Sequence, residues 1–151
     1  MQMISDKDRE TIREYFDQRL KGDVDLVMFT ERPSPIIIPG KEQCETCEPT
    51  RELLEEVASL SDRLKLTVHE ISEASEQATQ LGIDRVPAFV ARGASRGLVR
   101  FFGIPSGYEF SAMIADLIDV STGETDLSEA TKQFLSALTE NVNIKVFTTP
   151  T

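Results

Sequence analysis

Cys44-Glu45-Thr46-Cys47 holds both cysteines of the chain, and the neighbouring segments are arranged around it. A nearly continuous apolar run, Val24–Thr30, precedes the cysteines and has the character of a strand that is buried on both faces. From Thr50 to about Asp62, leucine and valine recur at helical spacing. The order of strand, cysteine pair and helix predicts that the pair lies at the N-terminus of that helix.

A cysteine pair at a helix N-terminus is suited to disulfide exchange. The first turn of a helix has free N–H groups and a positive dipole end, so it stabilises a thiolate and lowers the thiol pKa. Cys44 is expected to be the more exposed thiol and to attack, and Cys47 is expected to resolve the mixed disulfide. Glu45 and Thr46 lie between them and tune the pair. Because the negative charge of Glu45 opposes the dipole, we expect only a modestly lowered pKa for Cys44 and a reducing pair.

The C-x-x-C spacing alone also permits two other interpretations. Zinc sites use the same spacing but require four ligands, and this chain has two cysteines and one histidine. His69 is expected on a different element, facing solvent or the backbone, so a zinc site would require two chains that share their cysteine pairs. The third interpretation is a redox-inert docking or scaffold module whose cysteine pair is incidental. No metal site within one chain and no cofactor are predicted.

The composition limits the classes of partner. The chain has 151 residues and a net charge of −10, which fits one domain and argues against nucleic acid or an anionic membrane surface as partner. The N-terminus has no apolar secretory core, and no apolar run approaches the ~18 residues of a membrane span. A cytoplasmic location is therefore expected. In that reducing compartment a close cysteine pair is more often catalytic or metal-binding than structural.

The remaining elements follow from hydrophobic periodicity. Residues 6–20 form an amphipathic helix that is capped by Ser5, and Leu64–Glu70 alternates as a strand with one face to the core. Further elements are expected as a short helix at 73–81, a strand hairpin within 87–102 and a helix capped by Ser106. The first two strands are joined through a helix and should be parallel, whereas the last two are antiparallel. The prediction is an α/β fold with a mixed four-stranded sheet, helices on both faces and an additional N-terminal helix.

The C-terminal part of the sequence resembles the beginning of a second unit. A helix is expected at 126–138, and the stretch 141–149 resembles Val24–Thr30 in its polar entry, apolar run and Phe-Thr exit. This similarity indicates either an internal repeat with only its first strand present or an ordinary C-terminal strand. We expect one domain at 1–121, followed at 122–151 by a linker helix and the first strand of a truncated second unit.

The pair Cys44 and Cys47, the strand before it and Val86-Pro87 about forty residues later resemble a thioredoxin-fold protein. In that superfamily the matching proline is cis and lies against the active disulfide. The residue before it pairs through its backbone with a bound peptide. The resemblance therefore implies a cis Pro87 and a substrate-binding role for Val86 and Pro87.

The sequence is more closely similar to the glutaredoxin-like protein disulfide oxidoreductases. Three stretches carry the similarity: Asp84 to Ala88, Arg100 to Phe110 and Val146 to Thr151. Members of this prokaryotic family have two thioredoxin-fold units in tandem, each with a C-x-x-C. The similarity implies that this chain is an N-terminal unit that exchanges disulfides with protein substrates without a bound cofactor. Its electrons would come from a thiol reductase or a second thioredoxin-like unit.

The chain departs from that family in three respects. The loop at 31–43 contains three prolines and is longer than usual, and its role is not evident from the sequence. Pro49 follows the cysteine pair by two residues and is expected to delay or kink the start of the helix. The second C-x-x-C of the tandem family is missing.

Overall fold

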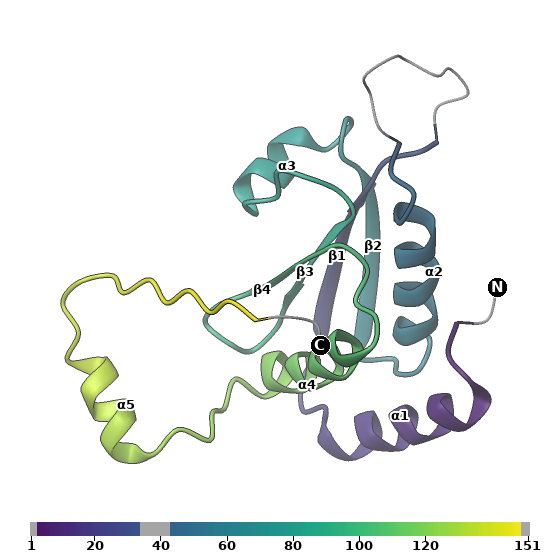
Figure 1. Cartoon of the computed structure of the whole chain (residues 1–151). Coiled ribbons are helices and arrows are strands. Elements are labelled where there is room, and N and C mark those ends of the chain that lie inside the picture. The colour runs from purple at the N-terminus through teal and green to yellow at the C-terminus, as the bar shows by residue number, and fades with distance from the viewer. Residues whose placement is uncertain (1–2, 34–42, 149–151) are drawn as a thin grey trace.

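The computed structural model describes residues 3–33 and 43–148, and its centre is one four-stranded sheet (Figure 1). Along the sheet the strands are ordered β2-β1-β3-β4. Their bounds are β1 Val24–Thr30, β2 Leu64–Glu70, β3 Ala88–Arg92 and β4 Val99–Phe102. The helices of the described residues are α1 Asp6–Arg19, α2 Cys47–Ala58, α3 Ser75–Gln80, α4 Tyr108–Thr122 and α5 Glu129–Ser136. None of these helices is both long and apolar enough to span a membrane.

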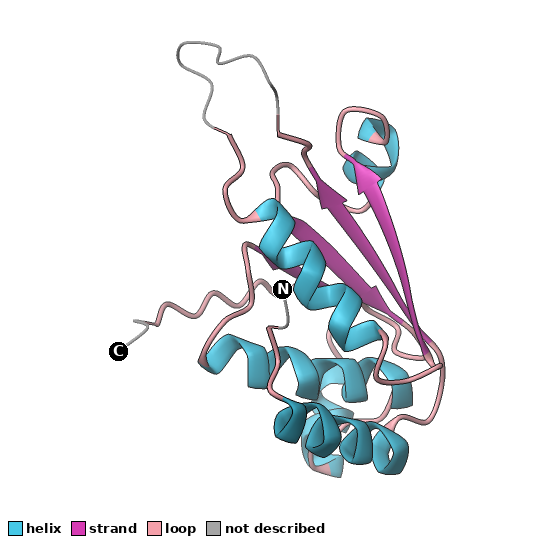
Figure 2. Cartoon of the chain, turned by 90° about the vertical axis from the view of Figure 1, so that its right-hand side faces the viewer, coloured by secondary structure: helices cyan, strands magenta, loops and turns pink. Residues whose placement is uncertain are grey.

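The pairing of the strands is mixed, as the sequence predicts. β1 pairs in parallel with β2, to which it connects through α2, and antiparallel with β3, while β3 and β4 form an antiparallel hairpin. Helices α1, α2 and α4 cover one face of the sheet, and α3 lies against the other (Figures 1 and 2). The predicted α/β fold with its additional N-terminal helix is confirmed.

The side chains of β1 alternate between two hydrophobic cores. Leu26 and Met28 belong to the larger core with residues of α1, α2 and α4, whereas Val27 and Phe29 belong to the smaller core with Ala78 of α3. All four of these side chains are buried, which explains the nearly continuous apolar run in the sequence. The central strand is thereby held from both faces, and the segment that follows it starts from a rigid position.

The N-terminal helix is closed by its expected cap. The Ser5 hydroxyl accepts the backbone N–H of Asp8 at 3.2 Å and donates to the Asp8 carboxylate at 2.6 Å. Ile12 and Phe16, one turn apart, are buried against the larger core. The helix ends at Arg19, with Leu20 already extended, so Gly22 lies beyond its end.

The starts of α2 and α4 differ from the prediction in ways that bear on the site. Helix α2 begins at Cys47, three residues before the predicted Thr50, and therefore includes Pro49 in its first turn. N–H groups of the first turn have no partner within the helix, so proline costs no hydrogen bond there and does not delay the helix. Ser106 does not cap α4 through its side chain, because Gly107, with φ of 59°, takes the N-cap position.

The C-terminal segment differs most from the prediction. Helix α5 spans Glu129–Ser136 rather than 126–138, and residues 139–148 adopt no strand. The prediction of a strand from residue 141 is therefore wrong. A β-strand is defined by its pairing with a neighbouring strand, and no pairing to this segment is seen among the described residues. The side chains of Val142, Ile144 and Val146 are 63%, 81% and 78% exposed. The end of the predicted stretch, from residue 149, lies outside the described residues, and the division of the chain at residue 121 stays a prediction.

Candidate active site: the Cys44–Cys47 disulfide

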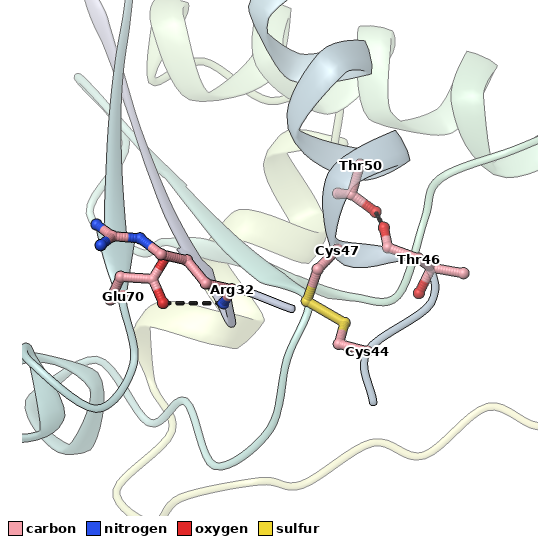
Figure 3. The surroundings of a disulfide bond; sticks show 6 residues. All are labelled: Arg32, Cys44, Thr46, Cys47, Thr50 and Glu70. Atoms are coloured by element: carbon pink, nitrogen blue, oxygen red, sulfur yellow. Dashed lines mark hydrogen bonds and ion pairs between the residues drawn. A yellow bond between two sulfur atoms is a disulfide. The ribbon is translucent and has the colours of Figure 1, made fainter. Parts of the chain in front are cut away.

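Cys44 and Cys47 form a disulfide at the start of α2 (Figure 3). The S–S distance is 2.06 Å and the two Cα atoms lie 5.4 Å apart. Cys47 is the first residue of the helix and only 2% exposed, whereas Cys44 lies in the preceding turn and is half-buried. The N–H of Cys47 points back to the Cys44 carbonyl at 3.5 Å. The pair is therefore placed so that a partner reaches Cys44 before Cys47.

Thr50 holds the turn between the two cysteines. Its N–H and its hydroxyl both donate to the carbonyl oxygen of Thr46, at 3.0 and 2.6 Å (Figure 3). Thr50 is completely buried, and Thr46 is the N-cap residue of α2 without a side-chain cap of its own. Thr50 is not among the site residues predicted from the sequence. Its signal is a threonine four residues after the N-cap, the spacing at which a hydroxyl reaches back to a helix carbonyl.

The two residues next to the thiols are polar and exposed. The side chains of Glu45 and Thr46 both face solvent, and Glu48 follows in the first turn of the helix. A carboxylate in a first turn is stabilised by the helix dipole. The proposed tuning role of Glu45 and Thr46 stays a prediction, since the disulfide-bonded sulfurs do not titrate.

Val86 and Pro87 lie at the same end of the sheet as the disulfide. Pro87 directly precedes β3, whose first residue, Ala88, is paired with Phe29 near the end of β1. Helix α2 starts from this same end, because it runs back along the sheet between the parallel strands β1 and β2. The Val86–Pro87 peptide bond is cis. Pro87 is buried and Val86 half-buried, and the Pro87 carbonyl accepts the N–H of Gly103 at 2.8 Å.

In Figure 3 an arginine–glutamate pair lies to the left of the disulfide, with Thr46 and Thr50 to its right. The backbone N–H of Arg32 donates to one carboxylate oxygen of Glu70 at 3.0 Å, and its Nε lies 3.2 Å from the other. The Glu70 side chain is only 14% exposed. The pair joins the ends of β1 and β2, where Thr30 is in register with Glu70. Sequence reasoning missed it, although opposite charges at the ends of two strands that are predicted to be parallel are a usable signal.

Two of the cavities formed by the described residues bear on the site. One of about 430 Å³ lies beside the Arg32–Glu70 pair and is lined by Arg32, Arg51, Val68, His69, Glu70, Glu73 and Ala74. A larger one of about 690 Å³ opens between α1 and α4, with apolar side chains such as Ile12 and Phe110. Neither cysteine lines the larger cavity, so its size alone does not connect it with disulfide chemistry.

No group of three or more His, Cys, Asp or Glu side chains suited to a metal ion is found within residues 3–33 and 43–148. His69, the single histidine of the chain, is half-buried on β2, and its ring packs against Phe29 with centroids 5.7 Å apart. It is therefore a packing residue on an element different from the one that carries the cysteines.

The architecture of this chain is similar to that of several solved structures. No protein-family model and no curated protein matches the sequence. Among solved structures, the alkylhydroperoxide reductase protein AhpF from Enterococcus faecalis V583 superposes with a TM-score of 0.74 at 22% identity, covering 91% of this chain and 62% of that one. A protein disulfide oxidoreductase from Aeropyrum pernix K1 superposes with a TM-score of 0.73 at 28% identity, covering 91% and 56%.

The chain has a thioredoxin-type fold. A structure of the NTD_N/C domain of the Enterococcus AhpF agrees, with a TM-score of 0.70 at 20% identity and coverage of 89% and 61%. The chain thus spans 56 to 62% of the length of these three structures. They are consistent with the predicted relation to the glutaredoxin-like protein disulfide oxidoreductases. The thioredoxin-type fold and a disulfide at C-x-x-C spacing support, in general terms, a thiol–disulfide oxidoreductase.

Proposed function

We propose that this chain exchanges its Cys44–Cys47 dithiol with disulfides of protein substrates. The observation that carries the proposal is the asymmetry of the pair at the start of α2, with a half-buried Cys44 ahead of a Cys47 that is 2% exposed. An accessible sulfur beside a sheltered one is what a two-step exchange requires, because the first thiol meets the substrate and the second acts only within the mixed disulfide.

The proposed reaction transfers two electrons. In the reduced protein the Cys44 thiolate attacks one sulfur of a substrate disulfide, which forms a mixed disulfide and releases the other substrate sulfur as a thiolate. The Cys47 thiol then loses its proton and attacks Cys44 Sγ, which closes the Cys44–Cys47 disulfide and releases the second substrate sulfur. The protein dithiol is oxidised and the substrate is reduced to two thiols. One of these thiols takes the proton of Cys47, and the other takes from solvent the proton that Cys44 released when its thiolate formed.

Helix α2 supports the first step electrostatically. The N–H groups of its first turn face the region of the two sulfurs and favour a negative charge there. Thr50 occupies the Thr46 carbonyl with two hydrogen bonds, which keeps the turn between the cysteines in one conformation. A preformed turn means that little rearrangement is needed between the dithiol and the disulfide.

We place the substrate peptide next to Val86. This residue lies in the bend that precedes β3, at the end of the sheet where α2 begins. A peptide that lies along Val86 would bring its disulfide toward Cys44. The buried ring of Pro87 would form the floor beneath it.

The electron donor and the remainder of the protein belong to the same proposal. We infer that a thiol reductase or a second thioredoxin-like unit regenerates the dithiol, without a bound cofactor in this unit. Residues 122–148 are interpreted as the link to such a second unit. Their exposed apolar side chains and the partial coverage of longer solved structures support this interpretation.

The proposal is tested by insulin reduction in the presence of dithiothreitol. The unmodified chain should accelerate the reaction, and Cys44→Ser should reduce the rate to that of dithiothreitol alone. Cys47→Ser should instead accumulate a mixed disulfide with insulin, which mass spectrometry detects. Equal rates for the unmodified chain and Cys44→Ser would contradict the proposal and favour a redox-inert docking module. Metal analysis and a native mass measurement test the interpretation as a zinc-bridged dimer, which would contain zinc and have twice the mass of the chain.

A further inference from the structure

Positive charges near the disulfide are already paired with carboxylates. Arg32 follows β1, Arg51 lies one helical turn after Cys47, and Arg85 lies two residues before Pro87, so all three arginines belong to this end of the sheet. Their ion pairs, with N–O distances, are Arg32–Glu70 at 3.2 Å, Arg51–Glu55 at 2.8 Å and Arg85–Asp84 at 2.8 Å. An arginine held by a carboxylate contributes little field to a ligand at a distance.

Two carboxylates at the disulfide have no such compensation. Glu45 lies between the two cysteines and Glu48 directly follows Cys47, and both are exposed. Neither makes a hydrogen bond or an ion pair within the residues that the structure describes. Within the described part of the chain, the rim of the disulfide, formed by Glu45 and Glu48, is therefore negative.

Arg51 is the cation nearest to Glu48 along the helix, and it does not balance that charge. Its hydrogen bond to Glu55 and the charge of Glu55 raise the pKa of Arg51, and Glu48 and Glu70 add to the effect through their charges. One guanidinium thus faces three carboxylates. The excess of negative charge around the start of α2 remains after every described ion pair is counted.

We propose that this rim selects disulfides flanked by positive charge, such as cystines beside lysine or arginine. This inference rests on the proposed function, because it names the substrate class of the same site. A cation next to the reacting sulfurs lies within several ångströms of Glu45 and Glu48 in the mixed disulfide, and an anion there is repelled. Between exposed charges the interaction is strong at low salt and is screened as the Debye length falls from ~30 Å at 0.01 M to ~3 Å at 1 M.

Stopped-flow oxidation of the reduced protein by three small disulfides tests the inference. Cystamine is a dication, bis(2-hydroxyethyl) disulfide is neutral and dithiodiglycolate is a dianion. Each rate constant is divided by that of dithiothreitol with the same disulfide, which removes intrinsic reactivity and the charge of the attacking thiolate. We expect the normalised rate for cystamine to exceed that for dithiodiglycolate about tenfold at 0.01 M salt and about twofold at 0.5 M.

Matched double variants locate the effect. Glu45→Gln with Glu48→Gln should lower the low-salt preference from about tenfold to about threefold. The control is Glu10→Gln with Glu14→Gln, which changes the net charge by the same amount on the exposed side of α1. Helix α1 lies at the far end of the sheet from the start of α2 (Figure 1), so this variant should keep the preference. Because selectivity is a ratio, a general change in thiol reactivity does not affect it.

The outcomes separate this inference from the function on which it rests. If the neutral disulfide reacts no faster with the reduced protein than with its Cys44→Ser variant, the proposed oxidoreductase function is wrong. If the neutral disulfide reacts rapidly but the cationic and anionic ones show equal normalised rates at low salt, only the charge selectivity is wrong. Equal losses of preference in the two double variants would also overturn it, since the preference would then follow net charge rather than the rim.

Discussion

Thr50 shows how a single side chain determines the geometry of the cysteine turn. A buried hydroxyl requires a hydrogen-bond partner, and this one uses the carbonyl of Thr46, the residue between Glu45 and Cys47. The same carbonyl accepts the Thr50 N–H, so the turn retains one bond when the hydroxyl is removed. Thr50 is thus a positioning residue for the disulfide.

Replacing Thr50 with valine keeps the shape of the side chain and removes only the hydroxyl. We expect the free energy of unfolding of the oxidised protein to fall by about 1 kcal/mol, because a buried hydrogen bond is lost while the Thr46 carbonyl keeps its second donor. Urea denaturation monitored by circular dichroism measures the change.

Thr79→Val is the matched control for this prediction. Thr79 makes the same hydroxyl-to-carbonyl bond, to Ser75 at 2.8 Å, but on the exposed surface of α3. Its replacement should change the free energy of unfolding by less than about 0.5 kcal/mol. Equal effects of the two substitutions would show that burial at the cysteine turn does not matter.

At the residue scale the sequence predicts the reactive cysteines better than the residues that hold them in position. Cys44 and Cys47 are recognisable because their spacing has few uses. Thr50, Arg32 and Glu70 belong to no recognisable sequence motif. Their roles arise from the groups that the fold places next to them, which are the Thr46 carbonyl for Thr50 and the opposite charge for each member of the ion pair. The pair depends on the register of two parallel strands, in which Thr30 meets Glu70. No local pattern in the sequence specifies that register.

Besides the packing of Ile12 and Phe16 on the larger core, one carboxylate of α2 ties the start of the additional helix α1 to the domain. Glu56 accepts the backbone N–H of Met3 at 2.6 Å and that of Ile4 at 3.1 Å, and it pairs with Arg9 at 3.1 Å. Its side chain is 15% exposed. The start of α1 and the last turns of the cysteine-bearing helix are therefore mechanically linked.

Glu56→Ala should release the start of α1. We expect the free energy of unfolding to fall by about 1–3 kcal/mol, since a partly buried N–H of Ile4 and the Arg9 guanidinium lose their acceptor. Hydrogen exchange should accelerate in the first turn of α1 more than in the sheet.

The neighbouring Glu55→Ala provides the comparison. Glu55 makes an exposed ion pair with Arg51 on the same helix, a type of interaction that contributes about 0.3–0.5 kcal/mol. If the two alanine variants are equally stable, Glu56 does not anchor α1.

The starts of the parallel strands β1 and β2 are joined by an exposed ion pair. Asp23 accepts from Lys65 at 2.6 Å, and this hydrogen bond, followed by the charge of Lys65, lowers the pKa of Asp23 below its ordinary value. A carboxyl whose folded pKa is depressed adds stability above the unfolded pKa of 3.8 and loses that contribution as the pH falls through the folded pKa. The pH dependence should therefore lie below about pH 4.

An NMR titration of the carboxyl carbons tests this pair. Asp23 should titrate below the ordinary aspartate value in the unmodified chain and closer to it in Lys65→Met. Between pH 5 and the folded pKa, the unmodified chain should then lose more stability than Lys65→Met. Lys7→Met, which removes a charge from α1, should leave the Asp23 midpoint in place. A midpoint that does not move in Lys65→Met would contradict the assignment.

Across the whole molecule, segments with a regular hydrophobic period are predictable from the sequence. The start of α2 and the conformation of the C-terminal segment are not. The apolar run of β1, the alternation of β2 and the hairpin of β3 and β4 specify the mixed sheet, because burial imposes these patterns. Pro49 misled the prediction of the start of α2, since proline breaks a helix interior but fits its first turn. The predicted C-terminal strand required a pairing partner that its own pattern does not provide.

Within residues 3–33 and 43–148, most of the exposed large apolar side chains lie in the C-terminal segment, from Leu127 onward. Phe134, Ile144, Val146 and Phe147 are 69%, 81%, 78% and 91% exposed. An apolar group of this size on a protein surface commonly marks an interaction surface. Since its members are exposed, their replacement should leave the packing of the domain intact while removing affinity for apolar probes.

Ile144→Asp with Val146→Asp should therefore change the free energy of unfolding by no more than about 0.5 kcal/mol. The same double variant should bind markedly less of an apolar fluorescent dye. Val27→Asp, which places a charge in the smaller core beneath the central strand, should instead destabilise the domain by several kcal/mol. If the exposed pair proved as costly to replace as Val27, residues 139–148 would contribute to the folded core, and their interpretation as a link to a second unit would have to be abandoned.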